Sequence, residues 1–263
     1  MGKLGEDKMN DYLVNMENAI NGNERWKLLE ELYNRNYLLK KNSTEIDNIP
    51  KIIHQIWLGG DFPQRYEKYR KKMLKINSNW AYRLWTDNDV ESFRLKNREL
   101  YNNIKNLGAK SDIFRYEILE RFGGLYVDVD FDFVKSFDDL CHLNFFAGNG
   151  HMQEPYIFNS IIASSSNHKI ISALVSGLQK KESFFDDIEG VMNNTGPYFL
   201  TNVFFENINL NDNVVIFPTK FLFPFPAVHR NSVDDSEKSQ KFIYSFLNEN
   251  SYCMHLWHTN WQK

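Results

Sequence analysis

The sequence predicts an α/β protein with a mixed, largely parallel sheet flanked by helices. From residue 50 to residue 133, short apolar runs that read as strands alternate with segments whose apolar residues recur at helical spacing. This alternation is typical of parallel strands joined by helical crossovers. The composition, with 42% hydrophobic and 25% charged residues, is that of an ordinary globular protein. At 263 residues the chain can form one large domain or two small ones.

Charge and cysteine content exclude several classes of protein. The net charge of -3 gives no reason to expect nucleic acid or an anionic membrane as the main partner, although peripheral membrane contact stays open. Only Cys141 and Cys253 are present, which argues against a disulfide scaffold and fits a reducing compartment. The N-terminus lacks the apolar core of a signal peptide, and no apolar run approaches the length of about 18 residues typical of a membrane span. We therefore expect a cytoplasmic protein without a transmembrane segment.

The first part of the chain is predicted to be a helical extension. Residues 6–41 carry apolar and aromatic residues on one helical stripe, and Asn21-Gly22-Asn23 interrupts it. We expect a helical hairpin packed on the main domain, with a partner-binding or membrane-surface role as the alternative. The polar stretch that follows suggests a boundary between the extension, residues 1–45, and the main domain, residues 46–263.

The main domain is expected to begin with a strand that ends in two glycines. The run from Lys51 to Gly60 predicts a buried strand whose carboxyl end enters a flexible loop. Open α/β sheets bind ligands at such ends. His54 is expected to be a satisfied core histidine. Trp57 could either pack in the core or stack on a nucleobase, and the residues alone favour the core.

The next elements continue the alternation of helix and strand. They are a helix from Pro63, a strand over residues 80–86 that turns at residues 87–89, and a helix over residues 91–105.

The stretch from Ala109 to Phe133 reads as a helix, a glycine turn and a strand. Ser111 is the expected N-cap, and apolar residues then recur at four-residue spacing up to Phe122. Gly123 and Gly124 end the helix.

From residue 125 the pattern becomes that of a strand, with three aspartates on one face. Asp128, Asp130 and Asp132 alternate with apolar residues, and Tyr126 shares their face. Neighbours two apart lie roughly 6.6 Å apart, so two carboxylates repel by about 2.5 kcal/mol at an effective dielectric near 20. A buried cluster needs a cation, whereas a solvated strand end needs none. Spacing alone leaves these two interpretations equally open.

The remainder of the chain predicts further strands and helices. The expected elements are strands within 141–149 and 156–165, helices over 168–180 and within 193–207, and an apolar strand broken by prolines within 214–226. Phe221, Phe223 and Phe225 are expected in a buried edge strand, with a membrane-facing patch as the alternative. Residues 252–263 read as a closing lid or a docking strand.

Three segments in order resemble a known family of enzymes. IPKIIHQIWLGG, WAYRLWTDND and AKSDIFRYEILERFGGLYVDVDF are similar to glycosyltransferase family 32, whose sugar-binding region contains a DXD motif. A more distant similarity is to the glucosylating domains of large clostridial toxins. The resemblance implies a GT-A fold for residues 46–263, a divalent metal, usually Mn²⁺ (or Mg²⁺), and retention of configuration at the transferred sugar.

The resemblance also implies roles for four residues of the central stretch. Asp130 would ligate the metal directly, and Asp128 would contact the ribose or sugar and the water shell of the metal. Asp112 and Arg115 match the element that holds the hydroxyl groups of the donor sugar. Asp132 is not required by the family pattern.

Other positions match the family less closely. Trp57 matches a tryptophan that stacks on uracil, which favours the nucleobase interpretation over core packing, and Trp261 matches a late tryptophan that contacts the diphosphate. A third metal ligand is expected from the C-terminal segment, either His255 or His258, with His258 preferred because it lies nearer to Trp261. Asn159 is the candidate for a group facing the opposite side of the sugar.

These features predict a metal-dependent, retaining glycosyltransferase. It would move a hexose from a nucleotide sugar, preferably a UDP-sugar, to a glycan or polysaccharide. An oxygen-ligated cation across both phosphates stabilises a diphosphate leaving group. The alternatives are a protein acceptor, as for the toxins, a catalytically silent nucleotide-sugar-binding module, or a metal-dependent phosphohydrolase.

Overall fold

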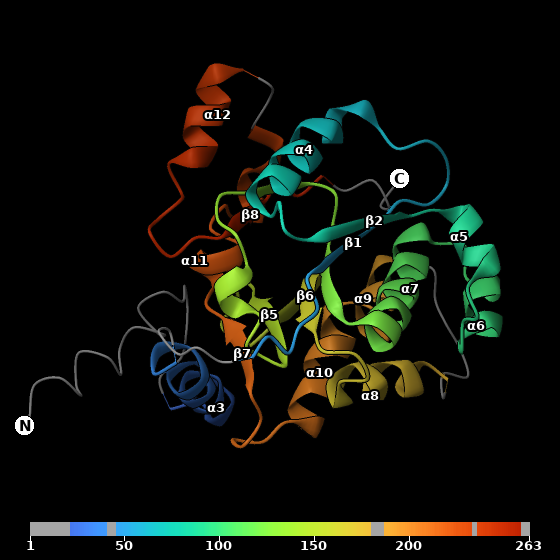
Figure 1. Ribbon diagram of the computed structural model, residues 1–263, viewed down its shortest axis with the longest axis horizontal. Helices are drawn as coiled ribbons and strands as arrows, with labels where there is room; N and C mark the ends of the chain where they lie inside the picture. The colour runs from blue at the N-terminus through green and yellow to red at the C-terminus, as the bar shows by residue number, and fades with distance from the viewer. Residues whose placement is uncertain (1–21, 41–45, 180–186, 233–235, 259–263) are drawn as a thin grey trace, which may run out of the picture.

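The computed structural model describes residues 22–40, 46–179, 187–232 and 236–258. It shows the predicted α/β architecture, in which helices surround a central sheet that runs from β7 at one edge to β2 at the other (Figure 1). The strands of this sheet are β1 (Ile52–Ile56), β2 (Ala81–Trp85), β3 (Gly124–Val127), β5 (Phe145–Asn149), β6 (Ile157–Ser164) and β7 (Val214–Phe217).

The central sheet is mixed, as expected. Its order is β2-β1-β3-β6-β5-β7. The pairs β1–β2, β1–β3 and β5–β7 are parallel, whereas β6 runs antiparallel to both β3 and β5. Because β1 and β3 are adjacent and parallel, their carboxyl ends meet at one edge of the sheet, where ligands bind in open α/β folds.

The predicted continuous strand over residues 125–133 is wrong, because the chain turns at Asp128–Asp130. Only β3 belongs to the central sheet, and β4 (Phe131–Phe133) pairs antiparallel with β8 (Cys253–His255) in a second, two-stranded sheet. Alternating apolar residues persist through the turn because both strands are buried, each against a different partner. The three aspartates therefore do not share one strand face.

The helix before β3 begins earlier than predicted. Helix α7 (Leu107–Phe122) is capped by Asn106, whose side chain accepts from the backbone N–H groups of Gly108 and Ala109. Ser111, the expected cap, lies inside the helix. Gly123 ends the helix with a positive φ of 63°, as its glycine predicted.

The predicted turn at residues 87–89 is the start of a helix instead. Thr86 and Asp89 form a capping box at the N-terminus of α5 (Asp87–Ser92). The chain then breaks before α6 (Arg98–Asn103), so the continuous helix expected over residues 91–105 is also wrong.

The remaining helices cover the sheet and its edges. Helices α7, α8 and α10 contact one another or β6, and α4 contacts β4 (Figure 1). These helices are α4 (Glu67–Ile76), α8 (Lys169–Leu178), α9 (Ile188–Asn194), α10 (Pro197–Asn207), α11 (Thr219–Leu222) and α12 (Glu237–Tyr244), with short helices η2 (Gln64–Tyr66), η3 (Asp138–Leu140) and η4 (Ala227–Ser232).

The second half of the predicted N-terminal hairpin is helical. Helix α3 (Glu24–Tyr33) continues into the short helix η1 (Asn34–Leu38), and α3 packs on edge strand β7. Its expected stripe is buried, with Trp26 and Tyr33 at 2% and 0% exposure. The first half, residues 1–21, lies outside the described residues, and the division at residue 45 stays a prediction.

The aromatic run near the C-terminus is buried. Phe221, Phe223 and Phe225 have no exposed surface, which excludes the membrane-facing patch and confirms their burial. They do not extend strand β7, because Pro218 precedes α11 and the chain then turns away. None of the helices described here has the length and apolar character needed to cross a bilayer.

Candidate active site

A cavity of about 660 Å³ opens at the carboxyl ends of β1 and β3. Residues that follow β1, among them Trp57 and Gly59, line one side, and the turn Asp128–Asp130 lines its floor. This is the edge of the sheet at which ligand binding is expected. The predicted site residues of α7 and β6 face the same cavity, together with His255 and His258.

Two aspartates and one histidine meet on the cavity floor. Asp128, Asp130 and His255 each offer a ligand atom within 4.8 Å of the other two. Nε2 of His255 lies 3.2 Å from Oδ1 of Asp130. Asp130 and His255 are buried, whereas the side chain of Asp128 keeps 30% exposure. This donor set fits a divalent cation, since carboxylate oxygens suit Mn²⁺ and Mg²⁺ and an imidazole favours the transition metal of the two.

The small sheet brings the histidine to the aspartates. In the β4–β8 register, Phe131 pairs with His255, and their rings stack at 4.5 Å between centroids. The backbone N–H of Leu256 donates to the carbonyl of Asp130. A strand pairing therefore fixes His255 next to the residue that follows the DXD motif.

His258 reaches the same carboxylate in a different way. Its backbone N–H donates to Oδ2 of Asp130 at 2.7 Å, and its ring packs 5.8 Å from that of Tyr66. Among the described residues, the ligand atoms that converge come from His255, so the geometry favours His255 over His258 as the third ligand.

The two aspartates titrate differently. Burial raises the pKa of Asp128, and the charge of Arg115 opposes this only in part. Burial also acts on Asp130, but His255 and the N–H of His258 outweigh it and hold the pKa of Asp130 below its ordinary value. Asp130 is thus ionised and ready to bind a cation near neutral pH.

A second polar group lies beside the carboxylate pair, built from α7 and β6. Asp112 and Arg115 are three residues apart on α7 and form a buried ion pair at 3.0 Å. Nδ2 of Asn159 donates to Oδ1 of Asp112 at 2.8 Å, and the Thr195 hydroxyl donates to Oδ2 at 2.8 Å. Burial raises the pKa of Asp112 to about 6, although all three partners stabilise its ionised form. The structure therefore brings together three predicted residues and one, Thr195, that had no predicted role.

Arg115 connects this group to the DXD turn. Its guanidinium lies 3.6 Å from Asp128 and 4.3 Å from the ring centroid of Tyr126. The Tyr126 hydroxyl donates to Oδ1 of Asp128 at 2.6 Å. Sequence reasoning placed Tyr126 on the aspartate face but gave it no role. Its period-two spacing from Asp128 was the available signal.

The remaining predicted residues fall into three cases. Trp57 lines the cavity and is partly exposed, with its ring 5.8 Å from that of Tyr66. Trp261 lies outside the described residues. Asp132 lies away from the cavity, in an ion pair with Lys72 at 2.6 Å and a hydrogen bond from Tyr244, which agrees with its exclusion from the expected site.

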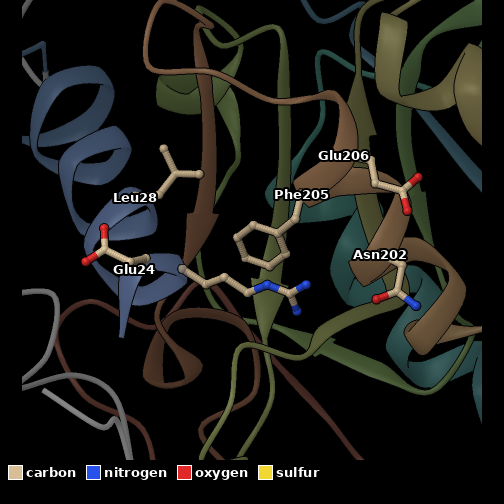
Figure 2. A pocket seen from close by; sticks show the side chains of 6 residues that line it. Glu24, Leu28, Asn202, Phe205 and Glu206 are labelled. Atoms are coloured by element: carbon tan, nitrogen blue, oxygen red, sulfur yellow. The ribbon is translucent and has the colours of Figure 1, made fainter. Parts of the chain in front are cut away.

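A smaller cavity of about 310 Å³ lies between α3 and α10. Figure 2 shows Glu24 and Leu28 of α3 on one side and Asn202, Phe205 and Glu206 of α10 on the other. The guanidinium of Arg25 on α3 lies 4.7 Å from the Phe205 ring centroid and connects the two helices. This cavity shares no residue with the cavity that holds the aspartates, and its contacts serve the docking of α3.

Comparison with known proteins identifies the family of this fold and site. A family model described as "Glycosyltransferase sugar-binding region containing DXD motif" matches residues 63–146. An uncharacterized glycosyltransferase of Acanthamoeba polyphaga mimivirus is 30% identical over 67% of this chain and 73% of that protein.

Two yeast relatives are named for mannosyl transfer. A mannosyl phosphorylinositol ceramide synthase of Saccharomyces cerevisiae is 26% identical over 59% of this chain and 42% of that protein. An inositol phosphoceramide mannosyltransferase of Schizosaccharomyces pombe is 25% identical over 66% and 48%. The match thus spans less than half the length of either yeast protein.

Solved structures confirm the fold. The glycosyltransferase PaToxG superposes with a TM-score of 0.52 and 21% identity, covering 69% of this chain and 78% of that chain. The catalytic domain of alpha-toxin from Clostridium novyi gives 0.56 and 10%, covering 89% and 83%. The predicted GT-A fold is therefore correct. With a 30% identical relative matched over most of its length, this chain belongs to the family of glycosyltransferases whose sugar-binding region contains a DXD motif.

Proposed function

We propose that this protein is a metal-dependent, retaining hexosyltransferase that uses a nucleotide sugar. The observation that carries the proposal is the convergence of Asp128, Asp130 and His255 on the floor of a large cavity, next to the ion pair of Asp112 and Arg115. The first group suits a cation and a diphosphate. The second suits the hydroxyl groups of a sugar.

Asp130 and His255 would hold a divalent metal, with Asp128 as a third ligand or through a water molecule. Such a cation would neutralise the negative charge that develops on a departing diphosphate. Mn²⁺ fits this mixed oxygen and nitrogen set better than Mg²⁺, because imidazole is a poor ligand for Mg²⁺.

The protein side chains would bind and orient the rest of the donor. Trp57 offers a partly exposed indole for stacking on the base, at the end of β1. Asp112 would accept from a sugar hydroxyl, and Arg115 would keep Asp112 and Asp128 in place. The Asn159 side chain is engaged by Asp112 and Tyr116, so it orients the site and does not act as a free nucleophile.

This arrangement supports retention by front-face attack. A covalent intermediate needs a nucleophile on the far side of the sugar, and Asn159 is held by its hydrogen bonds. The anomeric configuration of the product, measured by NMR, tests this part of the proposal. An inverted product would contradict it.

The nucleobase and the hexose of the donor are proposed from different likenesses. The sequence resemblance to the glucosylating domains of clostridial toxins implies a UDP-sugar, whereas the yeast relatives are named for mannosyl transfer. A panel of UDP- and GDP-sugars decides between them.

The acceptor is proposed to be a glycan or polysaccharide, at the cavity wall formed by residues of α9 and the start of α10. Aromatic and apolar side chains of this wall, such as Tyr198 and Met192, suit the faces of sugar rings. A protein acceptor is the alternative, and intact-mass measurement of candidate proteins after incubation with the donor detects it as a hexose increment. The cytoplasmic location stays a prediction.

The central test is the substitution Asp130→Asn. It removes a charge from the cation site with little change in volume, and we expect sugar-nucleotide turnover with Mn²⁺ to fall by at least about a hundredfold, as for loss of a group that stabilises the departing charge. Turnover over the donor panel, with and without a chelator, provides the measurement.

Asp132→Asn is the matched control. Asp132 is equally buried and lies two residues further on, but it pairs with Lys72 outside the cavity. We expect this variant to keep wild-type turnover. Turnover that persists both with a chelator and in Asp130→Asn would contradict the proposal. Binding of the donor without any turnover would indicate a catalytically silent binding module.

A further inference from the structure

Thr195 lies next to the cavity that holds the aspartates, and its side chain contacts the carboxylate of Asp112. It follows α9, is fully buried, and its hydroxyl donates to Oδ2 of Asp112 at 2.8 Å. The alternative acceptor, the carbonyl of Val191, is further away at 3.2 Å. The shorter, charge-assisted bond to the carboxylate is the stronger of the two.

The hydrogen bonds of Asp112 show which oxygen is left for a ligand. An ionised carboxylate has about four acceptor sites. Oδ1 accepts from Nδ2 of Asn159 at 2.8 Å and also lies 3.0 Å from Nη2 of Arg115 in the ion pair, whereas the bond described for Oδ2 is the one from the Thr195 hydroxyl. The charge of Arg115 thus engages Oδ1, and the acceptor site assigned to a sugar hydroxyl is on Oδ2. Thr195 holds this same oxygen.

Tyr116 fixes Thr195 from the other side. It lies one helical turn after Asp112 on α7, and its hydroxyl donates to the Thr195 carbonyl at 2.7 Å. The same hydroxyl accepts from Nδ2 of Asn159 at 3.1 Å. Asp112, Tyr116, Asn159 and Thr195 thus form a closed, buried hydrogen-bond network. Its bonds fix the direction in which each of the two hydroxyl groups donates.

The network also reaches the part of the cavity lining that comes from α9 and the start of α10. Val191 and Met192 before Thr195, and Pro197 and Tyr198 after it, all line the cavity. Thr195 is therefore the point at which this wall is hydrogen-bonded to the carboxylate expected to hold the donor sugar.

We propose that Thr195 is a positioning residue that orients Asp112 Oδ2 toward one hydroxyl of the donor sugar and so sets the affinity for the sugar moiety. This inference rests on the proposed use of a nucleotide-sugar donor. Tyr116 acts through Thr195 and Asn159 in the same network.

The test compares binding of a nucleotide with binding of its sugar derivative. Calorimetry with Mn²⁺ gives Kd for UDP, UDP-glucose and UDP-galactose, and for GDP and GDP-mannose. The ratio of Kd for the free nucleotide to Kd for its sugar derivative isolates the sugar contribution. For Thr195→Val we expect the ratio to fall about ten- to hundredfold for the preferred donor, as for loss of a hydrogen bond to a charged group, with Kd for the free nucleotide unchanged. Thr195→Ser keeps the hydroxyl and should restore the ratio.

Thr201→Val is the control for a merely structural role. Thr201 is a buried threonine of α10 whose hydroxyl donates to the carbonyl of Pro197 and not to Asp112. We expect it to lower Tm without changing the ratio. If Thr195→Val does not fold, Tyr116→Phe takes its place and must also lower the ratio.

The outcomes separate this inference from the proposed function. A wild-type protein that binds no nucleotide sugar in the presence of Mn²⁺ contradicts the proposed function. A wild-type protein that prefers a nucleotide sugar, while the folded Thr195 or Tyr116 variant keeps the same ratio, overturns only the role of Thr195.

Discussion

Asp130 is the carboxylate on which both C-terminal histidines converge. One of its oxygens faces the ring of His255, and the other accepts from the backbone of His258. The backbone N–H of His258 is kept when its side chain is replaced, whereas the ring nitrogen of His255 is lost when His255 is substituted. The two histidines can therefore be distinguished by substitution, although both contact the same aspartate.

We expect His255→Gln to weaken Mn²⁺ binding by at least about tenfold, since it removes an imidazole ligand. His258→Gln keeps the N–H that donates to Asp130 and should retain wild-type affinity. The increase of Tm on addition of Mn²⁺ reports the affinity, because binding to the native state stabilises it. Equal Tm increases in both variants would argue against His255 as a ligand.

His54 has the opposite character, that of a neutral histidine held in the core. Its Nδ1 accepts from the indole N–H of Trp85 at 3.1 Å, and Nε2 lies 3.0 Å from the carbonyl of Gly123. Because the indole can only donate, Nδ1 must be unprotonated. Burial lowers the pKa of His54 to about 4.

This contact predicts a stability loss in mild acid. Above the ordinary pKa of 6.5, His54 is neutral in both states and its contribution is complete. As the pH falls from 6.5 towards 4, the unfolded chain binds a proton that the folded chain does not, and up to about 3 kcal/mol of stability is lost. Urea denaturation across this range measures the loss. His54→Gln should show a flatter dependence, and an equally steep curve would contradict the assignment.

The joint between α7 and β3 is the element that orients the two halves of the site. Gly123 ends the helix and Gly124 begins the strand, with φ of 63° and 93°. A Cβ on Gly124 would lie 2.5 Å from the carbonyl oxygen of Ile52 on neighbouring strand β1. This joint, which admits no side chain, therefore sets the position of Asp112 on α7 relative to Asp128 after β3.

We expect Gly124→Ala to destabilise the protein by more than backbone strain alone. Gly22 is a matched reference, because its φ of 92° is nearly the same but no atom of the described residues lies within 4 Å of its added Cβ. Gly22→Ala should cost about 1–2 kcal/mol from the left-handed conformation, and Gly124→Ala at least about 2 kcal/mol more from the clash. Urea denaturation of both variants gives the difference between their losses of unfolding free energy. Equal losses would contradict the expected clash, because they would mean that β1 and β3 move apart to admit the methyl group at no cost in free energy.

For the whole molecule, the α/β class and the positions of most strands could be predicted from the pattern of the sequence, and the GT-A fold from its resemblance to glycosyltransferase family 32. Hydrophobic periodicity reports burial, and burial decides which segments become strands and helices. It does not report the partner of a strand. This is why residues 125–133 read as one strand although β4 pairs with β8 in a different sheet.

Local pattern also does not report which residues of the candidate site meet in the fold. Asn106 and Ser111 are both good caps, and the pattern of α7 does not say which of them begins the helix. His255 and His258 are both possible ligands by type, and only the register of β8 brings the ring of His255 to Asp130. Thr195 lies 83 positions after Asp112 in the chain, so no local pattern could associate them.

The pairing of β8 with β4 also has a consequence for the order of events during synthesis. Asp130 leaves the ribosome 125 residues before His255. At about 5–20 residues per second, this separation corresponds to about 6–25 s of translation. During this interval the nascent chain carries its DXD turn without the strand that brings the histidine, so the proposed cation site cannot be complete before β8 has been synthesised. The order of synthesis thus makes the strand that carries His255 the last part of the proposed metal site to appear.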